Sequence, residues 1–211
     1  MNLQQLSKNV ELEKILFNKL PEHLRSGFQK KFAKNNSSYW QIISEARAVI
    51  VFDDLGIPVK EIDFTTVKNK DVDFLAVFES ERIYTEVKGF MLKIFNLAKR
   101  GEWLGTDEEK IDRALRRAQP KFPDSSCNIL VISDENVFKS PLYDNPRVDS
   151  ENIPGMYMNH PEYIKTSAIM ILGGLYKDQL FEFMIWYNTN PQKSLPQNAV
   201  NIFDQKKTNK Y

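Results

Sequence analysis

The 211-residue sequence contains a single cysteine, Cys127, and only two histidines, His23 and His160. A lone cysteine excludes a disulfide within the chain, and it favours a reducing compartment, which we expect to be the cytoplasm. Neither histidine has a partner at metal-ligand spacing, which argues against a zinc site or a histidine general base. Cys127 lies at the edge of an apolar run, where a core position is favoured over a nucleophile.

Long hydrophobic runs and an excess of one charge are also missing. No apolar stretch approaches the roughly 20 residues that a helix needs to cross a bilayer. The first residues lack the basic start and apolar stretch of a signal peptide. Because 29 Lys and Arg balance 28 Asp and Glu, the net charge is +1. This balance neither supports nor excludes a nucleic-acid partner, since a local basic face can bind phosphates whatever the total charge.

The composition is that of a globular protein, with 42% apolar and 27% charged residues. The length suits one domain with additions to it. We expect an N-terminal helical extension over 1–36, a central domain over 37–190 and a weakly structured tail over 191–211. The extension could bind a partner or DNA, but packing on the core is the favoured interpretation.

Hydrophobic periodicity and turn residues predict the elements of an α/β fold. A buried helix is expected over 39–55, and a second helix over 106–119 starts with a capping box. Strands are expected over 59–64, 72–78, 83–87, 127–133, 168–175 and 180–187. We therefore expect a central sheet flanked by helices, with helices added before it and a hairpin at its C-terminal end.

The hairpin over 72–87 has charged residues at the ends of both strands. If its turn, 79–82, is symmetric, Phe78 lies opposite Ile83 and Asp73 lies opposite Lys88. A slip of one residue would move Asp73 to the other face of the sheet, so the register decides which charges meet.

This register places Asp73, Glu86 and Lys88 on one face, within roughly 5–8 Å of one another. Two carboxylates that close repel each other unless a cation lies between them, and a hard divalent ion prefers such oxygen ligands. Mg²⁺, with Mn²⁺ as a substitute, could polarise a phosphoryl oxygen there, while Lys88 offsets developing negative charge. Asp71 is the rival carboxylate, and Asp73 is favoured because Asp71 lies one pair further out, past the end of the second strand's motif.

At these residues the sequence resembles the PD-(D/E)XK nuclease superfamily. The family motif is an aspartate on one strand followed by Glu/Asp-x-Lys on the next, here Val72-Asp73 and Glu86-Val87-Lys88, with Val72 in place of the proline. The family also takes a glutamate from a preceding helix, and Glu45 fits that position. The resemblance covers residues 39–133 and implies a restriction-endonuclease-like fold, in which helices flank a central mixed β-sheet.

The resemblance implies a metal-dependent nuclease, an endonuclease rather than an exonuclease, with DNA as the favoured substrate. Asp73 and Glu86 would hold one or two Mg²⁺ ions with the help of the Val87 carbonyl. Glu45 would be an outer or direct ligand. Lys88 would position the attacking water and stabilise the charged transition state.

The family's helix after the Glu-x-Lys strand often presents basic or amide side chains to nucleic acid. In and before this helix, the candidates for such contacts are Lys93, Arg113, Arg116, Arg117 and Gln119. A solvated face is the competing interpretation, because Lys and Arg near a helix C-terminus also suit the helix dipole.

Two other interpretations stay open. The chain could be a nucleic-acid-binding or assembly module with a nuclease fold and no turnover, and a homodimer or larger assembly is compatible with the sequence. The charges could instead form a structural cluster of ion pairs. Glu45, on an apolar helix face, could pair with Arg47 or another basic side chain, because an unpaired buried carboxylate is costly.

Overall fold

The computed structural model describes residues 10–34, 39–66, 69–89, 107–133, 158, 160–173 and 182–207. Its strands are β1 (Val59–Thr65), β2 (Asp71–Phe78), β3 (Glu81–Gly89), β4 (Cys127–Ser133), β5 (Ala168–Gly173) and β6 (Glu182–Tyr187). They form a six-stranded sheet in the order β1-β2-β3-β4-β5-β6. The pairs β3–β4 and β4–β5 are parallel and the other pairs are antiparallel. The sheet is therefore mixed, as expected.

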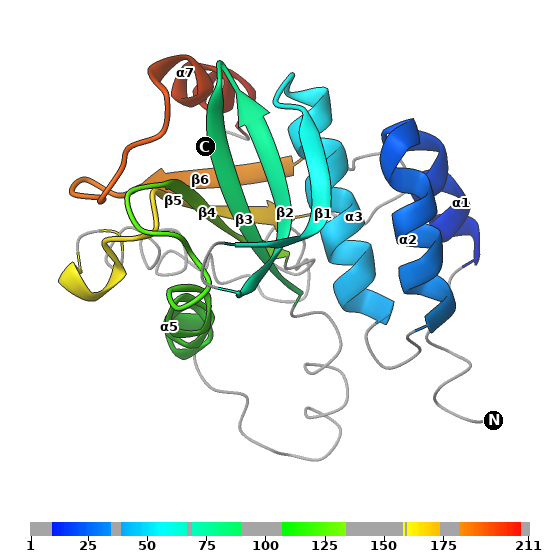
Figure 1. Ribbon diagram of the computed structural model, residues 1–211, viewed down its shortest axis with the longest axis horizontal. Helices are drawn as coiled ribbons and strands as arrows, with labels where there is room; N and C mark the ends of the chain where they lie inside the picture. The colour runs from blue at the N-terminus through cyan, green and yellow to red at the C-terminus, as the bar shows by residue number, and fades with distance from the viewer. Residues whose placement is uncertain are drawn as a thin grey trace, which may run out of the picture.

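Helices cover both faces of this sheet (Figure 1). One core cluster takes side chains from α1 (Val10–Lys19), α2 (Glu22–Lys34), α3 (Tyr39–Asp54) and α7 (Gln197–Lys206). The cluster on the other face takes them from α5 (Asp107–Ala118) and the short 3₁₀ helix η2 (Pro161–Tyr163). We call these the α3 face and the α5 face. In the described part of the chain, no helix is long and apolar enough to cross a membrane.

Most elements lie where the apolar periodicity predicted them. The helix expected over 39–55 is α3, the strand expected over 127–133 is β4, and β5 pairs with β6 as the expected C-terminal hairpin. The helices α1 and α2 pack on the α3 face through buried side chains such as Leu16, Leu20 and Phe28. Long buried runs predict elements well because burial constrains every position in them.

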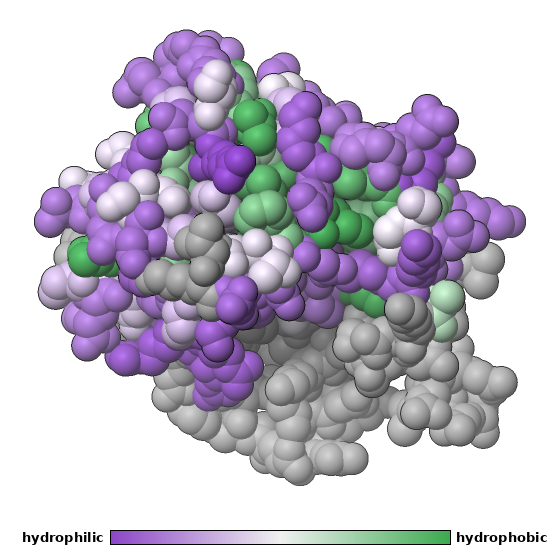
Figure 2. All heavy atoms as spheres, in the orientation of Figure 1, coloured by the Kyte–Doolittle hydropathy of each residue, from purple (hydrophilic) through white to green (hydrophobic). Residues whose placement is uncertain are grey.

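The outer surface is largely polar. Figure 2 shows hydrophilic side chains over most of the visible face, with hydrophobic side chains between them near the strands β1 to β3. Ile15 on α1 is the exposed large hydrophobic residue of the described part, with 37% of its surface accessible. The apolar residues of the described part are therefore mostly used in the two core clusters.

The β2–β3 register differs from the sequence prediction by two residues. Ile83 pairs with Ala76 rather than with Phe78. The turn contains only Glu79 and Ser80, which both have positive φ angles, 48° and 72°. Such two-residue turns match the twist of the strands, although glycine or asparagine is their usual signal. A shift of two residues preserves the face on which each side chain lies.

The C-terminal segment also differs from expectation, because residues 197–206 form α7 instead of a weakly structured tail. Leu195, Ala199 and Phe203 are buried in the α3-face core. Polar bonds attach the segment to the β2–β3 turn, including the 2.5 Å ion pair between Lys193 and Glu81. Only a few apolar residues stand among many polar ones here, so the composition concealed a short amphipathic helix.

We predict that Phe203→Ala destabilises the whole protein. Phe203 is fully buried, and a cavity of that size in a core costs about 3–5 kcal/mol. Urea unfolding should show a lower midpoint, whereas Gln205→Ala, an exposed change in the same helix, should change the free energy of unfolding by no more than about 0.5 kcal/mol. Equal stability of the two variants would mean that α7 is not part of the core.

Candidate functional site

The paired strands β1 and β2 twist sharply near Asp73, so that their two faces exchange sides. Residues two apart on a strand normally share a face, yet Phe74 belongs to the α3-face core and Val72 to the α5-face core. Across from this point in β1, Asp63 has a left-handed backbone with a φ angle of 52°, a conformation that aspartate tolerates better than most residues. Asp73 therefore lies where the strand changes its orientation.

As a result, β2 separates from β3 at this point. The paired residues of the two strands run from Phe78 and Glu81 only as far as Phe74 and Thr85. The predicted opposition of Asp73 and Lys88 is therefore wrong. The Asp73 carboxylate instead accepts a 2.6 Å hydrogen bond from the backbone N–H of Val87. The Asp73 side chain thus accepts the hydrogen bond that the backbone of β2 would otherwise accept from β3.

Gln41 of α3 also bonds backbone groups of β3 that have no partner in β2. Its Nε2 donates to the Val87 carbonyl at 2.8 Å, and its Oε1 accepts from the Gly89 N–H at 3.0 Å. The same Nε2 donates to Glu45 Oε1 at 3.1 Å. The glycine permits this close approach, since a Cβ at Gly89 would lie 2.6 Å from Ser44 Oγ. Sequence reasoning missed Gln41, although its spacing of four residues from Glu45 on one helix indicates a shared face.

Glu45 is 5% exposed, and it forms an ion pair with Lys31 of α2. The Nζ of Lys31 lies 2.6 Å from Glu45 Oε2 and 2.5 Å from Asp63 Oδ1. Arg47, the partner considered from the sequence, donates instead to the C-terminal ends of β4 and β5. The salt-bridge interpretation of Glu45 is therefore realised, with the N-terminal helical extension as the source of the cation.

Glu86 is completely buried and is bound by two lysines. Its Oε1 accepts from Lys88 and, at 2.6 Å, from Lys121, which lies just beyond the end of α5. Its Oε2 has no hydrogen-bond partner among the described residues. Burial lowers the pKa of Lys121, but the hydrogen bond and charge of Glu86 raise it more, so this lysine stays protonated. From the sequence, Lys121 is only a basic residue just beyond the helix over 106–119, because the fold alone brings it to Glu86.

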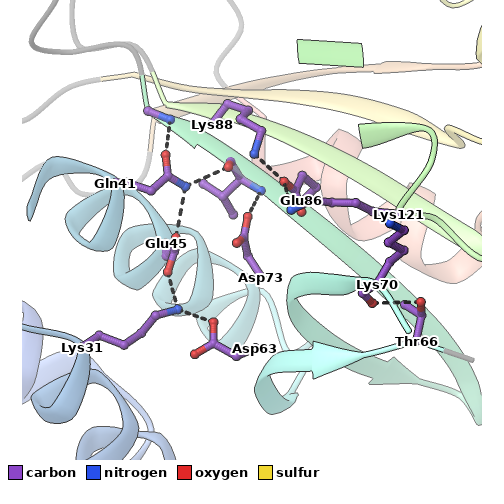
Figure 3. Close-up of polar contacts among 12 residues, drawn as sticks. Lys31, Gln41, Glu45, Asp63, Thr66, Lys70, Asp73, Glu86, Lys88 and Lys121 are labelled. Atoms are coloured by element: carbon purple, nitrogen blue, oxygen red, sulfur yellow. Dashed lines mark hydrogen bonds and ion pairs between the residues drawn. The ribbon is translucent and has the colours of Figure 1, made fainter. Parts of the chain in front are cut away.

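Asp73 lies between the other two carboxylates (Figure 3). Burial raises its pKa most, the charges of Glu86 and Glu45 raise it further, and together they bring it to about 7. The Val87 N–H and the Lys88 ammonium oppose this shift. Burial, together with the two neighbouring carboxylates, therefore lets Asp73 hold a proton near neutral pH.

The donor set fits a hard divalent cation better at Asp73 and Glu86 than at Glu45. Val87 packs in the α3-face core, so alternation along β3 turns Glu86 and Lys88 toward the α5 face, away from Glu45. Consistent with this, the described residues assemble no group of three acidic, histidine or cysteine side chains around one point. Such an ion prefers oxygen ligands, and Glu86 offers the buried Oε2, which has no hydrogen-bond partner in the described part of the chain.

The residues expected to contact nucleic acid are placed unevenly. Arg113 and Arg117 are exposed on α5. Arg116 is exposed too, but it binds an aspartate of its own helix and a glutamate of η2. Gln119 donates to the hydroxyl of a threonine before β5 at 2.5 Å. Lys93 lies outside the described residues. The exposed Arg113 and Arg117 thus lie on the C-terminal half of α5, and Lys121 follows shortly after its end.

Two further residues considered from the sequence are now located. Asp71, the rival to Asp73, is exposed and accepts a 2.7 Å hydrogen bond from the Thr65 hydroxyl. Cys127 is buried in the α3-face core, and burial raises the pKa of its thiol to about 11. This burial confirms the expected core position of Cys127. A thiol with so high a pKa is also unsuited to nucleophilic attack.

Comparisons of the chain with protein-family models, curated proteins and solved structures give no match.

We predict that Gln41→Leu loosens the junction between α3 and β3. It leaves the Val87 carbonyl and the Gly89 N–H without their partner, which should cost about 1–3 kcal/mol. Hydrogen exchange at the Gly89 amide should accelerate, and urea unfolding should shift to lower concentration. Gln29→Leu on the exposed side of α2 is the control, and unchanged exchange at Gly89 would contradict the role given to Gln41.

We also predict a pH-dependent penalty at Asp73 in the absence of divalent ions. Its pKa is raised to about 7 in the folded protein, so the folded state holds a proton that the unfolded state has released. Stability from this group therefore falls as pH rises from the unfolded value toward about 7. The stability of Asp73→Asn relative to the wild type should therefore rise with pH from about 4 to about 7 and stay level above that, measured by urea unfolding in EDTA. Asp71→Asn should show no such rise, and a flat Asp73→Asn difference would contradict the shift.

Proposed function

We propose that the protein is a metal-dependent nuclease that hydrolyses phosphodiester bonds, with DNA as the favoured substrate. The observation that carries the proposal is the meeting of Asp73, Glu86 and Lys88 where β2 separates from β3. The order of elements adds support, since the Glu45 helix, the Asp73 strand, the Glu86-Val87-Lys88 strand and a basic helix follow one another. This order and the mixed sheet are compatible with the restriction-endonuclease-like fold that the sequence resemblance implies.

In this proposal Asp73 and Glu86 hold Mg²⁺, or Mn²⁺ in its place. The Val87 carbonyl has a second lone pair beyond the one used by Gln41 and could add a ligand. A bound divalent ion supplies Lewis-acid polarisation of the phosphodiester group. Glu45 serves as an outer carboxylate that adds negative potential near Asp73, while Lys31 fixes its position.

Lys88 is the chain's own electrostatic catalyst in this proposal. Its side chain is 24% exposed while Glu86 is fully buried, so the ammonium lies on the side that a substrate can reach. A protonated amine placed there would orient the attacking water and offset the negative charge that develops on the phosphoryl oxygens. The exposed Arg113 and Arg117 on α5 provide positive charge for the flanking backbone phosphates.

A second candidate is a nucleic-acid-binding or assembly module without turnover. The ion pairs favour it, because Lys31 neutralises Glu45 and two lysines bind Glu86, as a purely structural cluster would require. Salt-dependent DNA binding without cleavage in any divalent ion would support this module over the nuclease.

We predict that Asp73→Asn and Lys88→Ala each reduce cleavage about 100-fold or more, because each removes one charged group of the reaction centre. Labelled DNA and RNA, duplex and single-stranded, would be incubated with the protein in Mg²⁺ and in Mn²⁺. Asp71→Asn, two residues away on the same strand, and Lys193→Ala, at the opposite end of β3, are the matched controls and should cleave normally. Undiminished cleavage by the Asp73 and Lys88 variants would refute the assignment.

A further inference from the structure

Lys121 approaches Glu86 from a fixed position. Its backbone N–H donates to the Ala118 carbonyl at 2.9 Å, and the next residue, Phe122, is completely buried in the α5-face core. The backbone on both sides of Lys121 is therefore held in place. Its Nζ then lies 2.6 Å from Glu86 Oε1, the oxygen that Lys88 also binds. Figure 3 shows the two lysines reaching Glu86 from different directions.

The two lysines provide more positive charge than Glu86 requires. One carboxylate oxygen receives two ammonium groups, while the other oxygen, Oε2, is buried without a hydrogen-bond partner among the described residues. Each ammonium has three N–H donors, and Glu86 takes only one from each. Solvent reaches part of Lys121, since its side chain is 33% exposed, whereas that of Glu86 is fully buried. A ligand arriving from solvent therefore meets cationic donors, and a phosphate group is their natural acceptor.

We propose that Lys121 is a second phosphate-binding lysine of the site, and that it leaves Glu86 when a divalent cation binds there. This inference rests on the proposed function, because it assumes that cation and nucleic acid share the site. In the protein without cation, Lys121 acts as a counter-ion for Glu86. When a cation takes over the glutamate, the ammonium is released toward the substrate backbone. Binding of the cation and of the phosphate then support each other.

This exchange predicts opposite effects of one substitution on two affinities. Lys121→Met keeps the length of the side chain but removes its charge. Without nucleic acid, Mn²⁺ no longer competes with the ammonium and should bind roughly three- to tenfold more tightly. With Ca²⁺ present, a labelled DNA duplex should bind roughly three- to tenfold more weakly, and the salt dependence of binding should fall by about one phosphate contact. Calorimetry measures the first affinity and fluorescence anisotropy the second.

Two variants serve as controls. Lys193→Met removes a lysine that is paired with a glutamate at the opposite end of β3 and is similarly exposed, at 38%, and it should leave both affinities unchanged. Lys121→Arg keeps the charge and should retain DNA binding. Thermal unfolding of each variant shows that the fold is intact.

The outcomes separate the two proposals. If Lys121→Met behaves like Lys193→Met, or if it weakens cation and DNA binding together, Lys121 is a structural residue and the inference is overturned while the nuclease proposal stands. If the wild-type protein binds neither Mn²⁺ nor Ca²⁺, the proposed function fails and the inference fails with it. Tighter Mn²⁺ binding together with weaker DNA binding supports both.

Discussion

The site depends on a backbone constraint at the point where β2 separates from β3. Val87 lies in a buried part of β3, and its N–H and C=O would remain unpaired once the neighbouring strand has turned away. Unpaired buried backbone groups are costly, so the fold must supply other partners. Asp73 accepts from the N–H, and Gln41 donates to the carbonyl. The geometry of the site therefore follows from completing an interrupted sheet, before any ligand is considered.

The same constraint places negative charges in a low-dielectric environment. Asp73 is held at the gap by its hydrogen bond, with Glu45 on the α3 side and Glu86 on the α5 side of β3. Because burial weakens screening, these carboxylates affect one another more strongly than they would at a surface. Lysines from separate parts of the chain compensate two of them. Burial raises the pKa of Asp73 most, Glu86 and Glu45 raise it further, and the Val87 N–H and the Lys88 ammonium only partly offset this.

The sequence predicts the elements well and their junctions poorly. α3 and β4 could be predicted because most of their residues are apolar and buried. The hairpin register could not, since Glu79 and Ser80 occupy a turn that normally signals itself with glycine or asparagine. α7 was concealed because its buried positions are few. Each of these misses comes from a local signal that is weak or absent in the sequence.

The candidate site divides in a similar way. Asp73, Glu86 and Lys88 could be proposed from spacing, because all three belong to one hairpin whose two-residue shift leaves the strand faces unchanged. Lys31 and Lys121 could not, since they lie 14 and 35 residues from the carboxylates that they bind. Their positions depend on how α2 and α5 pack on opposite faces of the sheet.

These two lysines also affect how well each of the three carboxylates could bind a divalent cation. Glu45 is compensated on one oxygen by Lys31 and on the other by Gln41, so both of its oxygens are already occupied. Both lysines bound to Glu86 contact Oε1, and Oε2 is buried with no hydrogen-bond partner among the described residues. At Asp73, the Val87 N–H and the Lys88 ammonium do not offset burial and the two neighbouring carboxylates. In the proposed site, a divalent cation would therefore gain most by binding between Asp73 and Glu86 and least by displacing Lys31. Glu45 would then be the supporting carboxylate, and α2 would hold it in place through Lys31.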